Sequence, residues 1–139
     1  MITDRVDNIT RIPEEYRSAL PPAPKSVKIE LTANCDFKCF YCATGSRLRD
    51  KGEIDWDFYC RIVQEMRDAG VEELGVFYLG ESFLYKKLPE AINYAKNVVG
   101  FPYVFLTSNG RMASPERVGD CIEAGLDSLK FSFNYADPA

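Results

Sequence analysis

Residues 27–42, VKIELTANCDFKCFYC, join an alternating strand pattern to a cluster of three cysteines. In residues 27–32 apolar side chains alternate with polar ones, which is typical of a strand with one packed face and one open face. The alternation returns at residues 128–133, where Leu129, Phe131 and Phe133 form the apolar face that is expected to pack under helices. Such strands are predicted either at an edge of the sheet that faces water or in a barrel-like sheet whose polar lumen holds a ligand.

The chain between these two strands alternates between helix and strand patterns. Further strands are predicted at 73–79 and 103–107, and helices at 55–70, 88–99 and 114–125. Because helix-length connections join successive strands, the strands are expected to pair in parallel with right-handed crossovers. The predicted fold class is α/β, a parallel sheet of about four strands with three connecting helices. The aromatic residues of the strands are interpreted as core: Phe77, Phe105, Phe131 and Phe133.

The composition is that of a globular domain. The 139 residues are 46% hydrophobic and 27% charged, which suffices for one hydrophobic core. A net charge of −4 disfavours nucleic-acid partners, and the lack of a long apolar run or leader pattern predicts a cytoplasmic protein without a membrane partner. Half of the eight prolines lie in residues 1–26, which are predicted to be an arm with a short helix at 13–20, outside a core of residues 27–139.

Five cysteines and no histidine narrow the possible chemistry. Without histidine, Ser–His and Cys–His catalysis and His-ligated zinc are excluded. Cys35, Cys39 and Cys42 lie within eight residues, and in a reducing compartment such a cluster indicates a metal site rather than disulfides. Three thiolates at this spacing can each bind a different iron of one cubane, which leaves the fourth iron open to a ligand.

The other two cysteines lie in predicted helices. Cys60 belongs to the first helix, and Cys121 shares the apolar side of the last helix with Val118 and Ile122. Both cysteines are interpreted as small buried residues. Two alternatives stay open: zinc held by the clustered triad together with Cys60 or Cys121, and an electron-carrying cluster whose fourth ligand comes from elsewhere.

The cysteine spacing resembles the signature of radical S-adenosylmethionine (SAM) enzymes, in which Cys-x3-Cys-x2-Cys follows the first strand and an aromatic residue, here Tyr41, precedes the last cysteine. Three later motifs at predicted strand ends resemble the Gly-Gly-Glu-Pro, Thr-Asn-Gly and Ser-x-Asp elements of that family: Leu79-Gly80-Glu81-Ser82, Thr107-Ser108-Asn109-Gly110 and Leu129-Lys-Phe-Ser-Phe-Asn134. The resemblance covers residues 27–134. It looks closest to the branch of SPASM-type peptide and sulfatase maturases and molybdenum-cofactor enzyme A-like proteins.

The resemblance implies a [4Fe–4S] cluster on the three clustered cysteines and SAM bound at its open iron. An external one-electron reductant would allow SAM to be cleaved to a 5′-deoxyadenosyl radical, which abstracts hydrogen from the substrate. The implied SAM contacts are Tyr41 at the adenine, Gly80 and Glu81 at the methionyl amino group, Ser108 and Ser132 at the ribose or carboxylate, and Asn109 and Asn134, the latter in place of an aspartate. Glu81 has a second interpretation, as the residue that begins a helix.

Two departures from the family pattern shape the functional prediction. Leu79 and Ser82 replace a glycine and a proline, and four strands make up only part of a core that resembles six βα units. The chain is therefore expected to be the N-terminal part of a longer radical SAM enzyme, or a half-core that another chain completes, with a peptide as a possible substrate. The alternatives are a non-enzymatic iron–sulfur electron-transfer or zinc-binding subunit and a metal-free α/β interaction domain.

Overall fold

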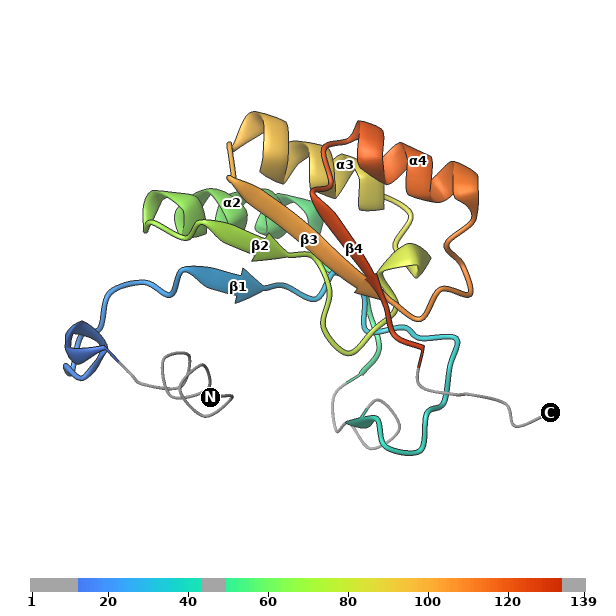
Figure 1. The fold of residues 1–139 in the computed structure, drawn as a ribbon, viewed down its shortest axis with the longest axis horizontal. Coiled ribbons are helices and arrows are strands. Elements are labelled where there is room, and N and C mark those ends of the chain that lie inside the picture. The colour runs from blue at the N-terminus through green and yellow to red at the C-terminus, as the bar shows by residue number, and fades with distance from the viewer. Residues whose placement is uncertain (1–12, 44–49, 134–139) are drawn as a thin grey trace, which may run out of the picture.

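The fold is a parallel sheet with helices on one face (Figure 1). A computed structural model describes residues 13–43 and 50–133. The strands pair in parallel in the order in which they follow one another along the chain: β1 (Ser26–Lys28), β2 (Glu73–Gly75), β3 (Tyr103–Ser108) and β4 (Ser128–Phe131). The predicted α/β class with a parallel sheet is confirmed.

Three helical connections join these strands: α2 (Trp56–Asp68), α3 (Leu88–Asn93) and α4 (Pro115–Glu123). All three lie on the same side of the sheet, as right-handed crossovers between neighbouring parallel strands require (Figure 1). The predicted helix at 88–99 has two parts, because α3 continues directly into a π-helical segment, η4 (Tyr94–Val98). Two single turns of 3₁₀ helix, η1 (Glu14–Tyr16) and η3 (Ser82–Leu84), complete the elements of the described residues.

Polar side chains cap the N-termini of two helices. Asp55 Oδ1 accepts the N–H of Phe58 over 2.8 Å at the start of α2, and Ser114 Oγ accepts the N–H of Arg117 over 3.3 Å at the start of α4. Such caps satisfy backbone donors that have no partner within the helix. Gly70 follows α2 with a φ of 97°, in the left-handed region that favours glycine. These local signals account for the agreement with the predicted helices.

The core lies between the helices and one face of the sheet. Tyr59 and Val63 of α2 are fully buried, and the Tyr59 hydroxyl donates to the carbonyl oxygen of Ala91 over 2.8 Å. Successive side chains of a strand point to opposite faces, so the sheet contributes every second residue. The large apolar side chains that β2, β3 and the position after β2 bury in this core are Leu74, Val76, Val104 and Leu106.

The first strand is shorter than predicted. β1 ends at Lys28 rather than at residue 32, because the chain beyond it has another partner. Leu31 O accepts the N–H of Ile54 over 2.8 Å, and Thr32 forms an antiparallel bridge with Glu53. These contacts draw the chain away from β2 just before the cysteine loop begins.

The second strand is also shorter than predicted, ending at Gly75 rather than at residue 79. The N–H groups of Leu79 and Gly80 donate to Glu30 Oε1 over 3.1 Å and 3.0 Å, so a side chain rather than a strand takes up these backbone donors. The chain after β2 is thereby held as a loop beside the chain after β1.

The prediction that all four strand aromatics belong to the core is wrong. Phe131 is 37% exposed and Phe133 is 79% exposed, because β4 is an edge strand and none of the described residues pairs with its outer side. Phe77 and Phe105 are half-buried and meet edge to face, with ring centres 5.6 Å apart, on the side of the sheet without helices. Ile122, predicted on the apolar side of α4, is 61% exposed.

The proline-rich segment is described from residue 13 onward. The predicted helix at 13–20 is reduced to the single turn η1, none of whose residues is buried. The segment joins the core at Lys25, whose carbonyl oxygen accepts the N–H groups of Glu72 and Glu73, each over 2.9 Å. No helix within the described ranges is long and apolar enough to span a bilayer.

Candidate functional site

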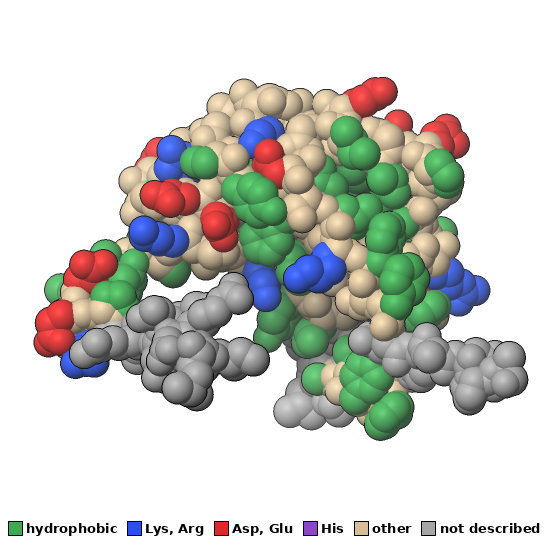
Figure 2. Space-filling view, in the orientation of Figure 1, with side chains coloured by type: hydrophobic (Ala, Val, Ile, Leu, Met, Phe, Trp, Pro, Cys, Tyr) green, Lys and Arg blue, Asp and Glu red, His purple; other side chains and the backbone are tan. Residues whose placement is uncertain are grey.

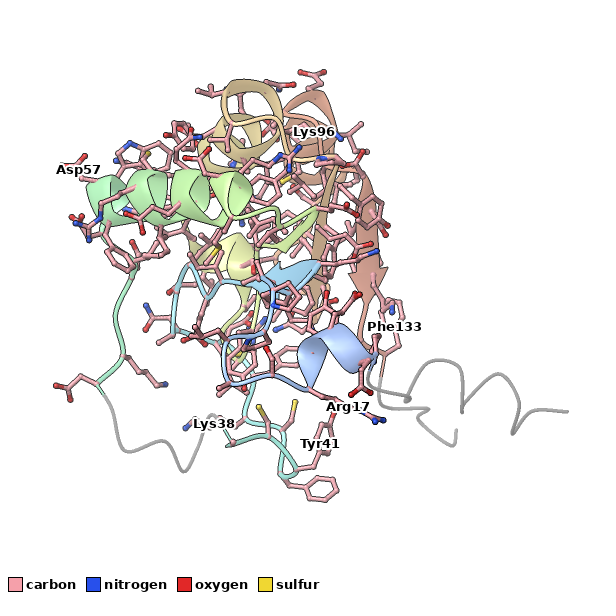
Figure 3. The ribbon with its side chains drawn as sticks, turned by 90° about the vertical axis from the view of Figure 1, so that its left-hand side faces the viewer. Arg17, Lys38, Tyr41, Asp57, Lys96 and Phe133 are labelled. Carbon is pink, nitrogen blue, oxygen red and sulfur yellow. The ribbon has the colours of Figure 1, made fainter. Side chains whose placement is uncertain are left out.

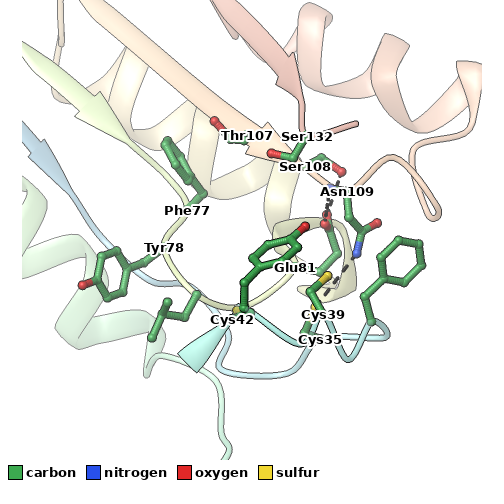
Figure 4. A pocket seen from close by; sticks show the side chains of 14 residues that line it. Cys35, Cys39, Cys42, Phe77, Tyr78, Glu81, Thr107, Ser108, Asn109 and Ser132 are labelled. Carbon is green, nitrogen blue, oxygen red and sulfur yellow. Dashed lines mark hydrogen bonds between the residues drawn. The ribbon is translucent and has the colours of Figure 1, made fainter. Parts of the chain in front are cut away.

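A pocket opens where the strands end, between the cysteine loop and the segments that follow β2, β3 and β4 (Figure 4). The carboxyl ends of parallel strands meet at one edge of a sheet, so residues far apart in the sequence converge there. Nine of the ten predicted site residues line this pocket: Cys35, Cys39, Tyr41, Cys42, Gly80, Glu81, Ser108, Asn109 and Ser132. The tenth, Asn134, lies outside the described residues. Convergence is a structural finding, and the role of each residue stays a prediction.

The three clustered cysteines all line the pocket. Each thiol is half-buried, and a turn closes where the Cys42 N–H donates to Cys39 O over 3.0 Å. Within residues 13–43 and 50–133, no three His, Cys, Asp or Glu side chains lie close enough together to ligate a single metal ion. A cubane takes each thiolate on a different iron and spaces its ligands more widely than a mononuclear zinc does. Three thiols on one pocket wall therefore fit an iron–sulfur cluster better than zinc.

The remaining cysteines do not belong to this pocket. Cys121 is 1% exposed within the core, where burial raises the pKa of its thiol to about 11. Cys60 is half-buried on α2, and burial also raises the pKa of its thiol. Neither cysteine lines the pocket, so the structure does not bring Cys60 or Cys121 to the clustered triad, as the alternative zinc site would require. Cys121 is buried in the core as predicted, whereas Cys60, predicted to be buried, is only half-buried and packs against the core.

Glu81 joins the ends of β2 and β3 from a buried position, with 3% of the residue exposed. Its Oε1 accepts the Ser108 hydroxyl over 2.9 Å and the Phe83 N–H over 3.1 Å, and its Oε2 accepts the Asn109 N–H over 2.8 Å. The bond from Phe83 caps η3, so Glu81 does begin a helix, as its second interpretation predicts. A carboxylate offers roughly four acceptor positions, and three are filled here. These three bonds leave one acceptor position on Oε2 unused.

Gly80 lies where the loop after β2 passes the chain after β1. A Cβ at this position would lie 1.8 Å from Thr32 O, so only glycine fits. Glu30 holds the same loop through the N–H groups of Leu79 and Gly80, as described above. Leu79, which departs from the family pattern, lines the pocket without disturbing the close approach at Gly80.

Asn109 fastens the cysteine loop to the end of β3. Its Nδ2 donates to Asp36 Oδ1 over 2.8 Å and to Cys35 Sγ over 3.9 Å, while its Oδ1 accepts the N–H of Arg111 over 2.9 Å. Burial raises the pKa of the Cys35 thiol. The neighbouring carboxylates of Asp36 and Glu81 raise that pKa further, and hydrogen bonds to the sulfur oppose them.

The two predicted serines occupy the wall formed by β3 and β4. Ser108 is 2% exposed, and its Oγ donates to Glu81 and accepts the N–H of Gly110 over 2.9 Å. The Ser108 hydroxyl is thus used within the protein to shape the wall. The Ser132 N–H donates to Ser108 O over 2.8 Å, which extends the pairing of β4 and places Ser132 at the pocket. Tyr41 lies at the rim and is 52% exposed.

An aromatic surface on the side of the sheet without helices continues from the pocket. The strand register places Lys28, Gly75 and Phe105 in one lateral row, and Lys28 Nζ lies 5.2 Å from the centre of the Phe77 ring, which lines the pocket. A Cβ on Gly75 would lie 3.0 Å from both phenylalanine rings, so glycine makes room for them. In the space-filling view, apolar side chains gather over β2 and β3 with basic side chains beside them (Figure 2).

Two residues that support the site, Glu30 and Asp36, are not predicted from the sequence. In the sequence, Glu30 is one polar member of an alternating strand. The polar face of that strand is a candidate lining of a lumen that holds a ligand, and a carboxylate on this face is the signal that could have singled out Glu30. Asp36 lies between the first two clustered cysteines, where the motif specifies spacing and leaves the intervening residues open. The structure shows that Glu30 holds the second-strand loop and that Asp36 holds Asn109.

Comparison with known proteins agrees with this geometry. Residues 29–139 match the Radical SAM superfamily. The chain belongs to the radical SAM superfamily. The "PqqA peptide cyclase" of Streptomyces rochei is 31% identical over 118 residues, which make up 84% of this chain and 32% of that protein. The "Probable GTP 3',8-cyclase" of Methanopyrus kandleri is 31% identical over 121 residues, 87% of this chain and 38% of that protein.

This radical SAM chain spans about a third of the length of the curated relatives it matches. The crystal structure of BtrN in complex with AdoMet and 2-DOIA superimposes with a TM-score of 0.69 at 19% identity, over 76% of this chain and 44% of that chain. At this identity the likeness concerns the fold, and it agrees with a partial barrel. The predicted family and branch are confirmed.

Proposed function

We propose that this chain forms the cluster- and SAM-binding part of a radical SAM enzyme, with residues 27–139 in its core and residues 1–26 as an arm outside it. The observation that carries the proposal is the convergence of four separate motifs on one pocket. An electron carrier needs a fourth ligand to its cluster, and the two other cysteines, Cys60 and Cys121, do not line the pocket. A pocket beside an open iron suits a bound cosubstrate instead.

Cys35, Cys39 and Cys42 would each hold one iron of a [4Fe–4S] cluster. When bound and reduced, the cluster supplies the electron that converts SAM to methionine and a 5′-deoxyadenosyl radical, which takes hydrogen from the substrate. The part of the protein is to orient SAM and exclude water. The remaining acceptor position of Glu81, next to Gly80, suits the methionyl ammonium group. Tyr41 would contact the adenine, and Ser132, Asn109 and Asn134 would complete the contacts.

The substrate is proposed to be a peptide, and an external reductant is proposed to supply the electron. Support for a peptide comes from the relative named PqqA peptide cyclase and from the aromatic surface formed by Phe77 and Phe105 beside Lys28. Apolar rings beside a cation suit a segment that carries both apolar and acidic side chains. The surface adjoins the pocket through Phe77, so a bound peptide would reach the site where the radical forms.

The metal is tested by analysis of iron, acid-labile sulfide and zinc after anaerobic reconstitution. We expect iron and sulfide in the ratio of a [4Fe–4S] cluster, lost in a variant with Cys35, Cys39 and Cys42 all replaced by alanine. A variant with Cys60 and Cys121 replaced by alanine is the matched control and is expected to retain the metal. Zinc without sulfide in the unsubstituted chain would instead establish a zinc-binding subunit.

The substrate class is tested by chemical protection of Lys28. A mixture of short peptides is expected to slow acetylation of Lys28, measured by mass spectrometry, and to leave Lys87 unaffected. Lys87 is a matched control, because its Nζ also lies over an aromatic ring, 5.1 Å from the centre of Trp56. Protection of Lys28 by GTP and not by peptides would point to a nucleotide substrate.

A further inference from the structure

The Asn109 carboxamide has one orientation that its surroundings permit. Its Oδ1 accepts the Arg111 N–H, and its own backbone N–H is bound to Glu81. Turning the amide over would set Oδ1 against the Asp36 carboxylate and the Cys35 sulfur, both of which are acceptors. The Nδ2 group therefore faces these two residues, donating to Asp36 Oδ1 over 2.8 Å and to Cys35 Sγ over 3.9 Å. Figure 4 shows Asn109 beside Cys35.

Asp36 brings a weakly compensated negative charge next to Cys35. Its side chain is 17% exposed, and its Oδ2 is buried without a hydrogen-bond donor among the described residues. The cation that faces Asp36 is Arg111, whose Nε lies 3.7 Å from Oδ2 and whose side chain is 62% exposed. Water screens so exposed a partner, so the field of the Asp36 carboxylate persists at the neighbouring sulfur.

We propose that Asn109 and Asp36 tune, in opposite directions, the reduction potential of the cluster held by Cys35. The inference rests on the proposed function, because it requires a cluster on that thiolate. A hydrogen bond to a ligating sulfur stabilises the extra negative charge of the reduced cluster and raises the potential, whereas a fixed carboxylate nearby opposes reduction and lowers it. Since Asp36 also accepts from Asn109, one hydrogen-bonded unit carries both effects.

A redox titration of the reconstituted chain without SAM, followed by the electron paramagnetic resonance signal of the reduced cluster, tests this inference. In the variant Asp36→Asn, position 36 retains its size and an acceptor for Asn109 but loses its charge, so the potential is expected to rise. In the variant Asn109→Ala, the donor to sulfur is lost, so the potential is expected to fall. Asp57→Asn makes the same charge change at an exposed position of α2, far from the cysteine loop that carries Tyr41 (Figure 3), and is expected to have no effect.

Unchanged potentials in Asp36→Asn and Asn109→Ala, with the cluster intact, would overturn the inference and leave the proposed function standing. A shift in Asp57→Asn as large as that in Asp36→Asn would also overturn it, because the effect would then not be local. If the Asn109→Ala variant assembles no cluster, the reduction potential of the Asp36→Asn variant decides whether the inference holds. Failure of the unsubstituted chain to assemble a cluster contradicts the proposed function itself, and the inference with it.

Discussion

The Glu81 carboxylate accepts the backbone N–H of Asn109 over 2.8 Å and so links the end of β2 to the end of β3. Glu81 belongs to the second-strand motif and Asn109 to the third-strand motif, so two separately recognised elements are in direct contact. The bond is charge-assisted, and Glu81 is buried, which makes the link strong. The wall of the pocket is therefore shaped by contacts within the protein.

Replacing Glu81 by glutamine is expected to destabilise the metal-free chain. The side-chain amide can satisfy donors at its oxygen only, and its NH₂ group then faces one of the N–H groups that now donate to Glu81. A loss of about 1–3 kcal/mol in the free energy of unfolding follows, measured by urea denaturation. Glu65→Gln on the exposed side of α2 is the control and is expected to have no effect. Equal stability of the two variants would contradict the role given to Glu81.

Gly80→Ala is expected to destabilise the chain by about 3 kcal/mol or more, because the new Cβ meets the backbone of Thr32, which cannot move aside cheaply. Gly119→Ala within α4 is the matched control. A Cβ at Gly119 has no neighbour within 4 Å, and alanine is expected to stabilise the helix by about 0.5–1 kcal/mol. Thermal unfolding of both variants measures these changes in stability. A Gly80→Ala variant as stable as the unsubstituted chain would contradict the close approach of Gly80 to the backbone of Thr32.

Glu30→Ala is expected to weaken SAM binding by roughly tenfold, because the loop with Leu79 and Gly80 loses a charged acceptor for two backbone N–H groups. Glu30→Gln retains an acceptor and is expected to recover most of the affinity. Glu73→Ala, at the exposed start of β2, serves as the control. Equilibrium dialysis of the reconstituted proteins with SAM measures the effect. Equal affinity in Glu30→Ala and Glu73→Ala would show that the loop is held in place by other contacts.

The stability of the chain is expected to fall in alkaline solution partly because of Cys121. Its thiol has a pKa of about 11 in the folded chain against an ordinary value of 9.0. Above pH 9 the unfolded chain releases this proton while the folded chain keeps it, so the free energy of unfolding falls as the pH rises towards 11. Cys121→Ala is expected to show a shallower decline in urea denaturation over this range. Tyr59, whose pKa burial also raises, is present in both proteins, so equal slopes would exclude a contribution from Cys121.

The sequence predicts the fold well where a signal is local. The caps at Asp55 and Ser114 mark two helices, and each of the four motifs lies at or beyond the carboxyl end of one strand. Strand lengths could not be predicted, because they depend on contacts with distant residues. Glu30 binds the N–H groups of Leu79 and Gly80 after β2, and Ile54 donates its N–H to Leu31 O after β1. The alternation of apolar and polar residues along a strand does not show which distant residues will bond to the ends of that strand.

Exposure at the edge of the sheet could not be predicted for a similar reason. Phe131 and Phe133 have the pattern of packed residues, and whether they are covered depends on what pairs with β4. In the candidate site, spacing identifies the three cysteines but is silent on Asp36, which is recognisable only once Asn109 is seen to lie against it. Motifs thus located the pocket, and only the structure shows the contacts that support its wall.

Electron paramagnetic resonance of the anaerobically reconstituted and reduced chain, with and without SAM, tests the central claim most directly. The proposed function predicts a [4Fe–4S] signal that shifts when SAM is added, because SAM reaches an open iron beside Glu81 and Asn109. A cluster signal that SAM leaves unchanged would contradict SAM binding by this chain. Retained zinc with no iron–sulfur signal would contradict the assignment of the three clustered cysteines to a cluster.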